Sequence, residues 1–218
     1  MRKFWDSSVG KKVVMGLSGL VGIGFLIVHM LGNLQAFMGA ERFNAYSHLL
    51  KVQLIEVTWA VRAGLLVAVV VHVIAAYQLT MRNRAARPVA YGRREPQVST
   101  YASRTMRWGG VYLLAFIILH LGQFTLGWTA LLPEWTFEGA FRNVTIAFGR
   151  VQWVVLYLGA MAFLALHLYH GAWASMRTLG IAPTSAQPLR RRIPLVLAIV
   201  VAGGFSLVPL GVALGIIK

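Results

Sequence analysis

Long apolar stretches separated by short polar segments dominate this chain of 218 residues. A transmembrane helix needs about 20 consecutive apolar residues at a rise of about 1.5 Å per residue. Stretches of this kind cover residues 13–38, 59–81, 107–128, 151–176 and 193–217. Because a helix satisfies all of its own backbone hydrogen bonds, it suits a segment surrounded by lipid. The pattern therefore predicts an all-α integral membrane protein with five transmembrane helices in a single domain, residues 1–218.

The composition supports a membrane protein and narrows the classes of redox centre. Hydrophobic residues make up 58% of the chain and charged residues only 12%, which is about half the charged fraction of a typical soluble domain. The absence of cysteine excludes disulfides, thiolate-bound iron–sulfur clusters and thioether-attached haem. No phosphate-binding glycine loop, HExxH motif or nucleophile elbow occurs. A redox centre in this chain must therefore use other ligands.

Basic residues predict the orientation of the chain in the cell membrane. The net charge of +15 is interpreted through topology rather than as a nucleic-acid signal, because cytoplasmic segments of membrane proteins are rich in Lys and Arg. Most of these residues lie in the N-terminal arm and after the second and fourth stretches. We therefore expect a cytoplasmic N-terminus and an external C-terminus. The first apolar stretch is longer than a usual signal-peptide core, so we expect it to be retained.

Two connecting segments carry further expectations. The long basic segment after the second stretch, RNRAARPVAYGRREPQVSTYASR, is either a solvated loop at the lipid surface or a docking surface for a cytoplasmic partner. On the other side, GAERFNAYSHLLKVQLIE has enough apolar residues to form a short helix lying on the membrane.

Histidines recur near the middle of four of the apolar stretches, at His29, His72, His120 and His167, while the fifth stretch has none. A further histidine, His170, follows His167 by three residues. Ionisable residues at membrane depth are costly and are candidates for a functional site. The alternative for any single one is a packing residue held by a hydrogen bond.

The depth of these histidines sorts them into two levels. His72 and His167 are each 10 residues from the next cytoplasmic arginine, which corresponds to roughly 15 Å along a helix. His29 and His120 lie deeper, roughly 20–25 Å from the same boundary. Two neutral imidazoles at one depth fit the two axial positions of one haem iron, so two levels predict two haems. Zinc would need three or four ligands at one level, and a hard cation would need carboxylates.

The order of these motifs resembles the membrane anchor of class B succinate:quinone oxidoreductases, and the resemblance covers nearly the whole chain. It rests on FLIVHMLGN, GAERFNAYSH and HLYHGAW with RTLG behind it, and on one histidine in each of the first four stretches. It implies that the first four helices form a dihaem-binding bundle with two haems b. By resemblance, His29 and His120 bind the haem distal to the cytoplasmic subunits, and His72 and His167 bind the proximal haem. The depth of the residues predicts the same pairs.

The resemblance further implies the function of the chain. It would be the cytochrome b subunit of a succinate dehydrogenase, the respiratory complex II of the tricarboxylic acid cycle. A flavoprotein subunit that oxidises succinate and an iron–sulfur subunit would dock on the cytoplasmic face, and electrons would pass through both haems to menaquinone. Some fumarate-reducing members have an acid two residues before the fourth-span histidine. Here that position is Ala165, which favours succinate oxidation.

Three alternatives stay open. The chain would serve a fumarate reductase if the complex ran in the reverse direction. It would be the cytochrome b of another quinone-linked enzyme, such as a hydrogenase or formate dehydrogenase, if its partner docked from outside. A haem-free transporter could use the histidines as a proton relay, but acids or broken helices would then be expected within the spans.

Polar residues beyond the deeper histidine pair are candidates for the quinone site. A quinone headgroup needs hydrogen-bond partners beside an apolar channel. Asn33, Gln35 and Gln123 are candidate partners, and Glu41 could exchange protons. The alternative is that these residues end helices and face lipid headgroups.

We expect His167 rather than His170 to bind iron. His170 is only 7 residues from Arg177, so it lies roughly 4–5 Å closer to the cytoplasm than the level shared with the second stretch. In the family that the chain resembles, the ligand is the histidine four residues before the glycine of Gly-x-Trp, here Gly171 and Trp173. His170 would contact a haem propionate or, alternatively, meet water at the interface. We also expect an acceptor on the second ring nitrogen of His167, and haem contacts from the first four stretches only.

Overall fold

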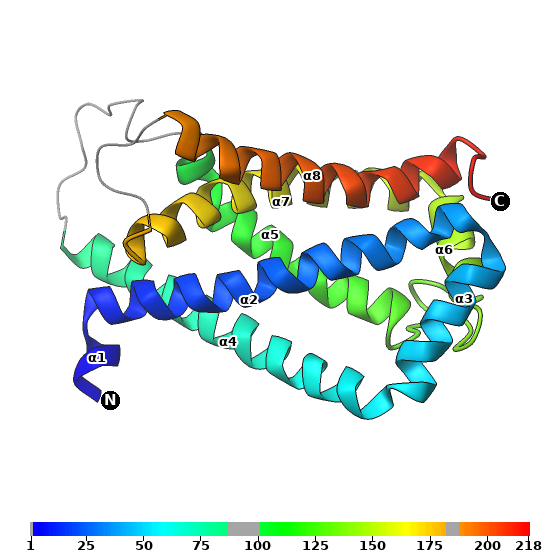
Figure 1. The fold of residues 1–218 in the computed structure, drawn as a ribbon, viewed down its shortest axis with the longest axis horizontal. Helices are drawn as coiled ribbons and strands as arrows, with labels where there is room; N and C mark the ends of the chain where they lie inside the picture. The colour runs from blue at the N-terminus through cyan, green and yellow to red at the C-terminus, as the bar shows by residue number, and fades with distance from the viewer. Residues whose placement is uncertain (1, 87–100, 182–187) are drawn as a thin grey trace.

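The computed structural model describes residues 2–86, 101–181 and 188–218, and these residues are almost entirely helical, without a strand. Five helices are long and apolar enough to cross a membrane (Figure 1). They are α2 (Ser8–Leu34), α4 (Ile55–Ala85), α5 (Tyr101–Phe124), α7 (Val151–Thr178) and α8 (Pro188–Ala213). The prediction of an all-α integral membrane protein is confirmed.

The ends of the long helices differ from the predicted boundaries for local reasons. Helix α2 begins at Ser8 rather than near 13, because the side chain of Ser7 accepts a hydrogen bond from the backbone of Gly10 and caps the helix. Helix α5 ends at Phe124 rather than near 128, and α8 ends at Ala213 rather than near 217. Gly127 and Gly215 follow these two ends with φ of 63° and 71°, a conformation in which glycine terminates helices readily.

Helix α7 lies at the centre of the packing. It contacts α8, α5 and α2, and α2 also contacts α4 and α8. One cluster of buried side chains lies between α7 and α8, and a second joins the short helices at the end of the bundle to α7 and α8. Helix α4 packs mainly along α2 and contributes no buried residue to either cluster. Most buried apolar side chains of the described residues therefore lie away from α4, which joins the bundle through its contacts with α2.

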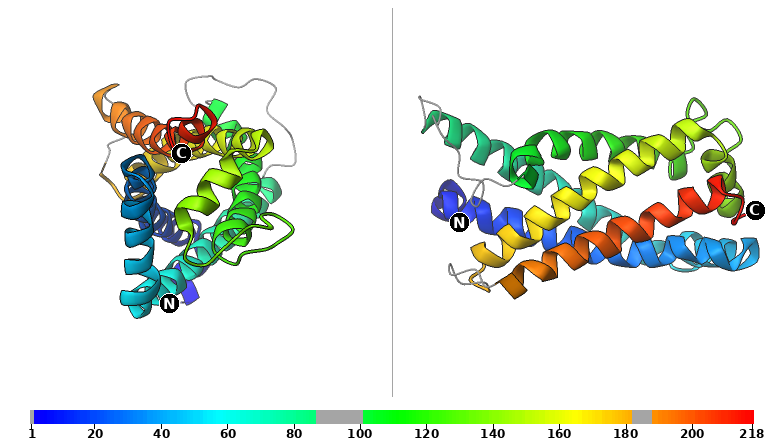
Figure 2. Two further views of the ribbon diagram at one scale, coloured as in Figure 1. Left: turned by 90° about the vertical axis from the view of Figure 1, so that its right-hand side faces the viewer. Right: turned by 90° about the horizontal axis from the view of Figure 1, so that it is seen from above.

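Short helices cover the end of the bundle that holds the C-terminus. The helix expected on this side is α3 (Ala40–His48), which follows the 3-10 helix η1 (Gln35–Met38) and leads into the π-helix η2 (Leu49–Gln53). Helix α6 (Ala140–Phe148), which the sequence pattern did not predict, packs against α3 (Figure 2). The backbone N–H of Phe141 donates to Oδ1 of Asn44 at 2.9 Å. These contacts tie the connection between α5 and α7 to the one between α2 and α4.

The opposite end of the bundle holds the short helix α1 (Arg2–Asp6) and most of the described cations. At this end Arg82 donates to the backbone oxygen of Asp6 at 2.6 Å. The buried Lys11 donates to the backbone oxygen of Trp5, also at 2.6 Å. Residues 87–100, which form most of the predicted basic loop with Arg87, Arg93 and Arg94, lie outside the described residues.

Two adjacent glycines on α8 offer a matched test of how closely the helices approach. A Cβ on Gly204 would collide with the buried side chain of Met30 on α2, whereas a Cβ on Gly203 would meet nothing within 4 Å. We expect Gly204→Ala to destabilise the detergent-solubilised protein by about 1–3 kcal/mol through overpacking. Gly203→Ala should be neutral, or stabilising by up to about 1 kcal/mol through helix propensity. Thermal unfolding followed by circular dichroism measures both, and equal midpoints would contradict this account of the α2–α8 contact.

Candidate functional site

Four histidines from four helices meet in two pairs inside the bundle. The rings of His29 on α2 and His120 on α5 have centroids 5.8 Å apart and planes inclined at 74°. The rings of His72 on α4 and His167 on α7 have centroids 6.1 Å apart and planes inclined at 49°. The structure therefore brings together the residues that their depth in the sequence assigns to one level. That each pair binds an iron stays a prediction.

Aromatic side chains hold the rings of the first pair. Phe25 stacks on His29 with a centroid distance of 5.2 Å and an angle of 12°. Phe205, from α8, lies 5.5 Å from the same ring, so the fifth helix packs against this site, and the absence of a haem contact from it stays a prediction. Phe116 and Phe124 flank His120 at 5.8 and 5.7 Å. These contacts surround the pair with apolar surface and restrict rotation of both imidazoles.

A buried hydrogen-bonded chain lies behind His120. Its Nδ1 is 3.1 Å from the hydroxyl of Tyr157 on α7. That hydroxyl donates to Oε1 of Gln123 at 2.8 Å. Gln123 is completely buried, and its Nε2 has no hydrogen-bond partner. Because the Tyr157 proton goes to Gln123, the phenolic oxygen accepts from Nδ1–H of His120, which leaves the lone pair of Nε2 free.

His72 is anchored by the backbone of α2. Its Nδ1 lies 3.0 Å from the carbonyl oxygen of Met15 and 3.2 Å from the hydroxyl of Ser18. A carbonyl oxygen can only accept, so Nδ1 carries the proton and Nε2 keeps its lone pair. A backbone acceptor on one nitrogen of a metal-binding histidine is a common way to fix the ring and its tautomer.

The other member of each pair is held differently. The amide nitrogen of Asn33 donates to the backbone oxygen of His29 at 2.7 Å and lies 3.3 Å from its Nδ1. The Nδ1 of His167 is buried and has no partner, so the expected acceptor is not found among the described residues. Thr105 and His167 both line a small hollow. The hydroxyl of Thr105 is turned to its own helix, where it donates to the carbonyl of Tyr101 at 3.1 Å. Each pair thus contains one histidine whose Nδ1 faces an acceptor and one whose Nδ1 faces none among the described residues.

His170 is half-buried on α7, one turn beyond His167. Within the described parts of the chain its ring makes no ring–ring contact with His72, whereas the ring of His167 does. His170 therefore lies outside the two pairs, as its depth predicts.

The distance between the two rings of each pair fits a pair of histidines that would hold one haem iron. An iron between two imidazoles, each bound at about 2 Å as in other histidine–metal sites, holds the ring centroids about 6 Å apart. Glycines lie close to two of the rings, because a Cβ on Gly19 would lie 3.4 Å from His72 and one on Gly110 would lie 3.8 Å from His167, both in van der Waals contact. Among the described residues no three His, Asp or Glu side chains cluster for a metal ion.

The residues expected to bind quinone are dispersed. Gln123 is buried behind His120, and Asn33 is hydrogen-bonded to its own helix beside His29. Gln35 is half-buried in η1, and Glu41 is exposed near the start of α3. Asn33 therefore contacts His29, and Gln123 contacts Tyr157, which in turn contacts His120. A quinone role for all four residues stays a prediction.

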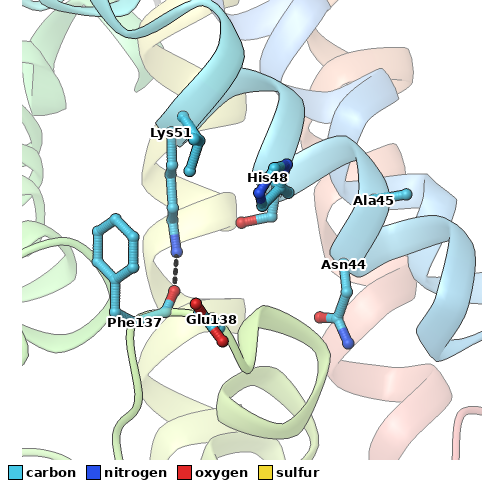
Figure 3. A pocket seen from close by; sticks show the side chains of 8 residues that line it. Asn44, Ala45, His48, Lys51, Phe137 and Glu138 are labelled. Carbon is cyan, nitrogen blue, oxygen red and sulfur yellow. Dashed lines mark hydrogen bonds between the residues drawn. The ribbon is translucent and has the colours of Figure 1, made fainter.

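A hollow lies elsewhere, between α3, η2 and the segment before α6 (Figure 3). It measures about 400 Å³ and is lined by Asn44, Ala45, Ser47, His48, Lys51, Val52, Phe137 and Glu138. The Nζ of Lys51 points into it and donates to the backbone oxygen of Phe137 at 2.7 Å. Burial lowers the pKa of Lys51, and the nearby Arg62 lowers it further. None of the residues expected at the quinone site lines this hollow.

Sequence reasoning missed Ser18, Tyr157 and Phe205, which contact three of the four paired histidines. Each lies on a different helix from the histidine that it contacts, and spacing along one helix does not encode such contacts. The one signal was at Tyr157, because a phenol within an apolar stretch needs a hydrogen-bond partner when it is buried.

Comparisons of the chain with known protein families, with curated proteins and with solved structures find no match. The case for a function therefore depends on the geometry of the two histidine pairs and on the motifs of the sequence.

Proposed function

We propose that this chain is the dihaem cytochrome b membrane anchor of a succinate dehydrogenase. In this proposal it carries electrons from a cytoplasmic iron–sulfur subunit through two bis-histidine haems b to menaquinone. The observation that carries the proposal is the presence of two histidine pairs, each with its rings about 6 Å apart, on four membrane-spanning helices. The resemblance of the motifs to class B anchors supplies the identity of the complex.

The residues of the chain would prepare each pair for iron. The carbonyl of Met15 and the hydroxyl of Tyr157 accept from Nδ1 of His72 and His120, so the opposite nitrogen of each ring is free to bind metal. The apolar side chains around the rings exclude water and keep the imidazoles neutral. A haem b bound in this way supplies one-electron transfer at an iron without an open coordination position.

The charge distribution supports partner docking at the end of the bundle that holds the N-terminus. Described cations gather at this end: Lys3, Lys12, Arg82, Arg84, Arg104, Arg107, Arg177 and Arg192. In the proposal this end faces the cytoplasm and receives the iron–sulfur subunit, which in turn carries the flavoprotein. The pair His72–His167 would then be proximal to the partner, and the pair His29–His120 distal.

The end that carries α3 would be the quinone side. Asn33 is bonded to His29, and Gln123 is bonded to Tyr157. Gln35 and Glu41 are therefore the first candidates for contact with the quinone headgroup. The position two residues before His167 is the half-buried Ala165, whose side chain cannot carry a proton. This supports succinate oxidation over the reverse, fumarate-reducing direction.

The pairing is tested by removing the histidines one at a time. In the purified complex we expect a reduced-minus-oxidised visible spectrum of two haems b. His29→Ala and His120→Ala should remove the same spectral component, and His72→Ala and His167→Ala should remove the other. Loss of one ligand leaves iron with a single axial imidazole in each case. A spectrum without haem would refute the proposed function, and a component shared by His29 and His72 would refute the pairing.

The two neighbouring histidines of α7 should behave differently. His167→Ala should abolish the proximal haem and leave the distal spectrum largely intact, because only His167 faces the ring of His72. His170→Ala should retain both haems and at most shift the proximal potential. Haem-to-protein ratios and potentiometric titrations measure both variants. Loss of a haem in the His170 variant, with both retained in the His167 variant, would reverse the assignment.

A further inference from the structure

The hydrogen-bonded chain behind His120 is the most completely buried polar feature among the described residues. The side chain of Gln123 is fully buried, and Tyr157 is only 7% exposed. Polar groups at such a place are costly unless they are paired, yet Nε2 of Gln123 has no partner. The hydroxyl of a phenol and a side-chain amide therefore occupy the space directly behind one histidine of one pair.

The direction of this chain of bonds determines the tautomer of His120. With Oε1 of Gln123 as the acceptor, the Tyr157 hydroxyl donates away from the histidine and its oxygen accepts from Nδ1–H. With the amide reversed, Nε2 would donate to Tyr157, whose proton would then go to Nδ1. His120 would carry its proton on Nε2 and could not bind metal through that nitrogen.

We infer that Tyr157 and Gln123 are positioning residues that fix the tautomer of His120 and tune the reduction potential of the haem on the His29–His120 pair. This inference rests on the proposed function. An acceptor on Nδ1–H raises the basicity of the imidazole. A more basic ligand stabilises the oxidised iron relative to the reduced iron, and so it lowers the potential of this centre.

The His72–His167 pair offers a comparison, because a different kind of group contacts its anchored histidine. There Nδ1 of His72 lies 3.0 Å from the Met15 carbonyl, which no side-chain substitution removes, and 3.2 Å from the Ser18 hydroxyl. The two centres are therefore tuned by different kinds of group, and only the centre on His29–His120 depends on a replaceable phenol. A change at Tyr157 should act on one haem and leave the second as an internal reference.

Three variants of the purified complex test the inference. Tyr157→Phe removes the acceptor, and Gln123→Met removes the group that orients it at nearly constant volume. Tyr112→Phe is the matched control, because its hydroxyl also links α5 to α7 but donates to the carbonyl of Leu156 at 3.3 Å. Potentiometric titrations monitored by visible spectra resolve the two haems, and the histidine variants described above assign each component. The low-spin electron paramagnetic resonance signal of each haem reports its axial ligands.

We expect Tyr157→Phe and Gln123→Met to raise the potential of the haem on His29–His120 and to change its low-spin signal. The expected shift is about tenfold in the ratio of reduced to oxidised haem, or about 59 mV for a one-electron couple. The haem on His72–His167 should not change, and Tyr112→Phe should change neither. Two haems with unaltered potentials in both variants, or an equal shift in the control, would overturn the inference and leave the proposed function standing. A wild-type complex without haem would overturn both.

Discussion

The arrangement of this protein depends on the cost of placing an imidazole in hydrocarbon. A histidine at membrane depth must be neutral, and its N–H needs an acceptor or its lone pair a partner. His72 and His120 meet the first need through a carbonyl of α2 and a phenol of α7. Both bonds cross between helices, so they fix how the helices face each other. A second imidazole lies opposite each anchored ring. A metal bound between the two rings would stabilise this arrangement.

Packing around α7 and α8 fixes the positions of the helices that carry the histidines. Small residues let the helices approach closely in lipid, where no hydrophobic force drives one helix against another. Gly204 against Met30 and the fully buried Ala160 and Val201 are examples. Helix α4 lies outside this packed region and carries His72. A haem held between His72 and His167 would therefore also join α4 to the rest of the bundle, so that cofactor binding and helix packing would stabilise each other.

The two ends of the bundle differ in chemistry. One end gathers arginines and lysines around α1, and the other is covered by α3 and α6. In the proposed function, the cationic end would bind a soluble partner and the end covered by α3 and α6 would bind a quinone. The two histidine pairs lie at two depths between these ends, so electrons would pass stepwise along the bundle axis.

The features that could be predicted from the sequence are those that depend on position along one helix. The five spans follow from apolar length, and the two levels of histidine follow from a constant rise per residue. This is why His29 could be matched with His120, and His72 with His167, without knowledge of how the helices pack. His170 was separated from His167 by the same count.

Tertiary structure alone decided what each imidazole faces. Gln123 and Asn33 were expected at a quinone site because they are polar residues beyond a histidine, and that role stays a prediction. The packing of α5 against α7 decided that Gln123 accepts a hydrogen bond from Tyr157. Phe205 reaches His29 from a helix that carries no histidine, and His167 lacks the acceptor that a metal-binding histidine usually has. Rotation and approach of helices are set by side chains far apart in the chain, whereas depth is set by the geometry of each helix by itself.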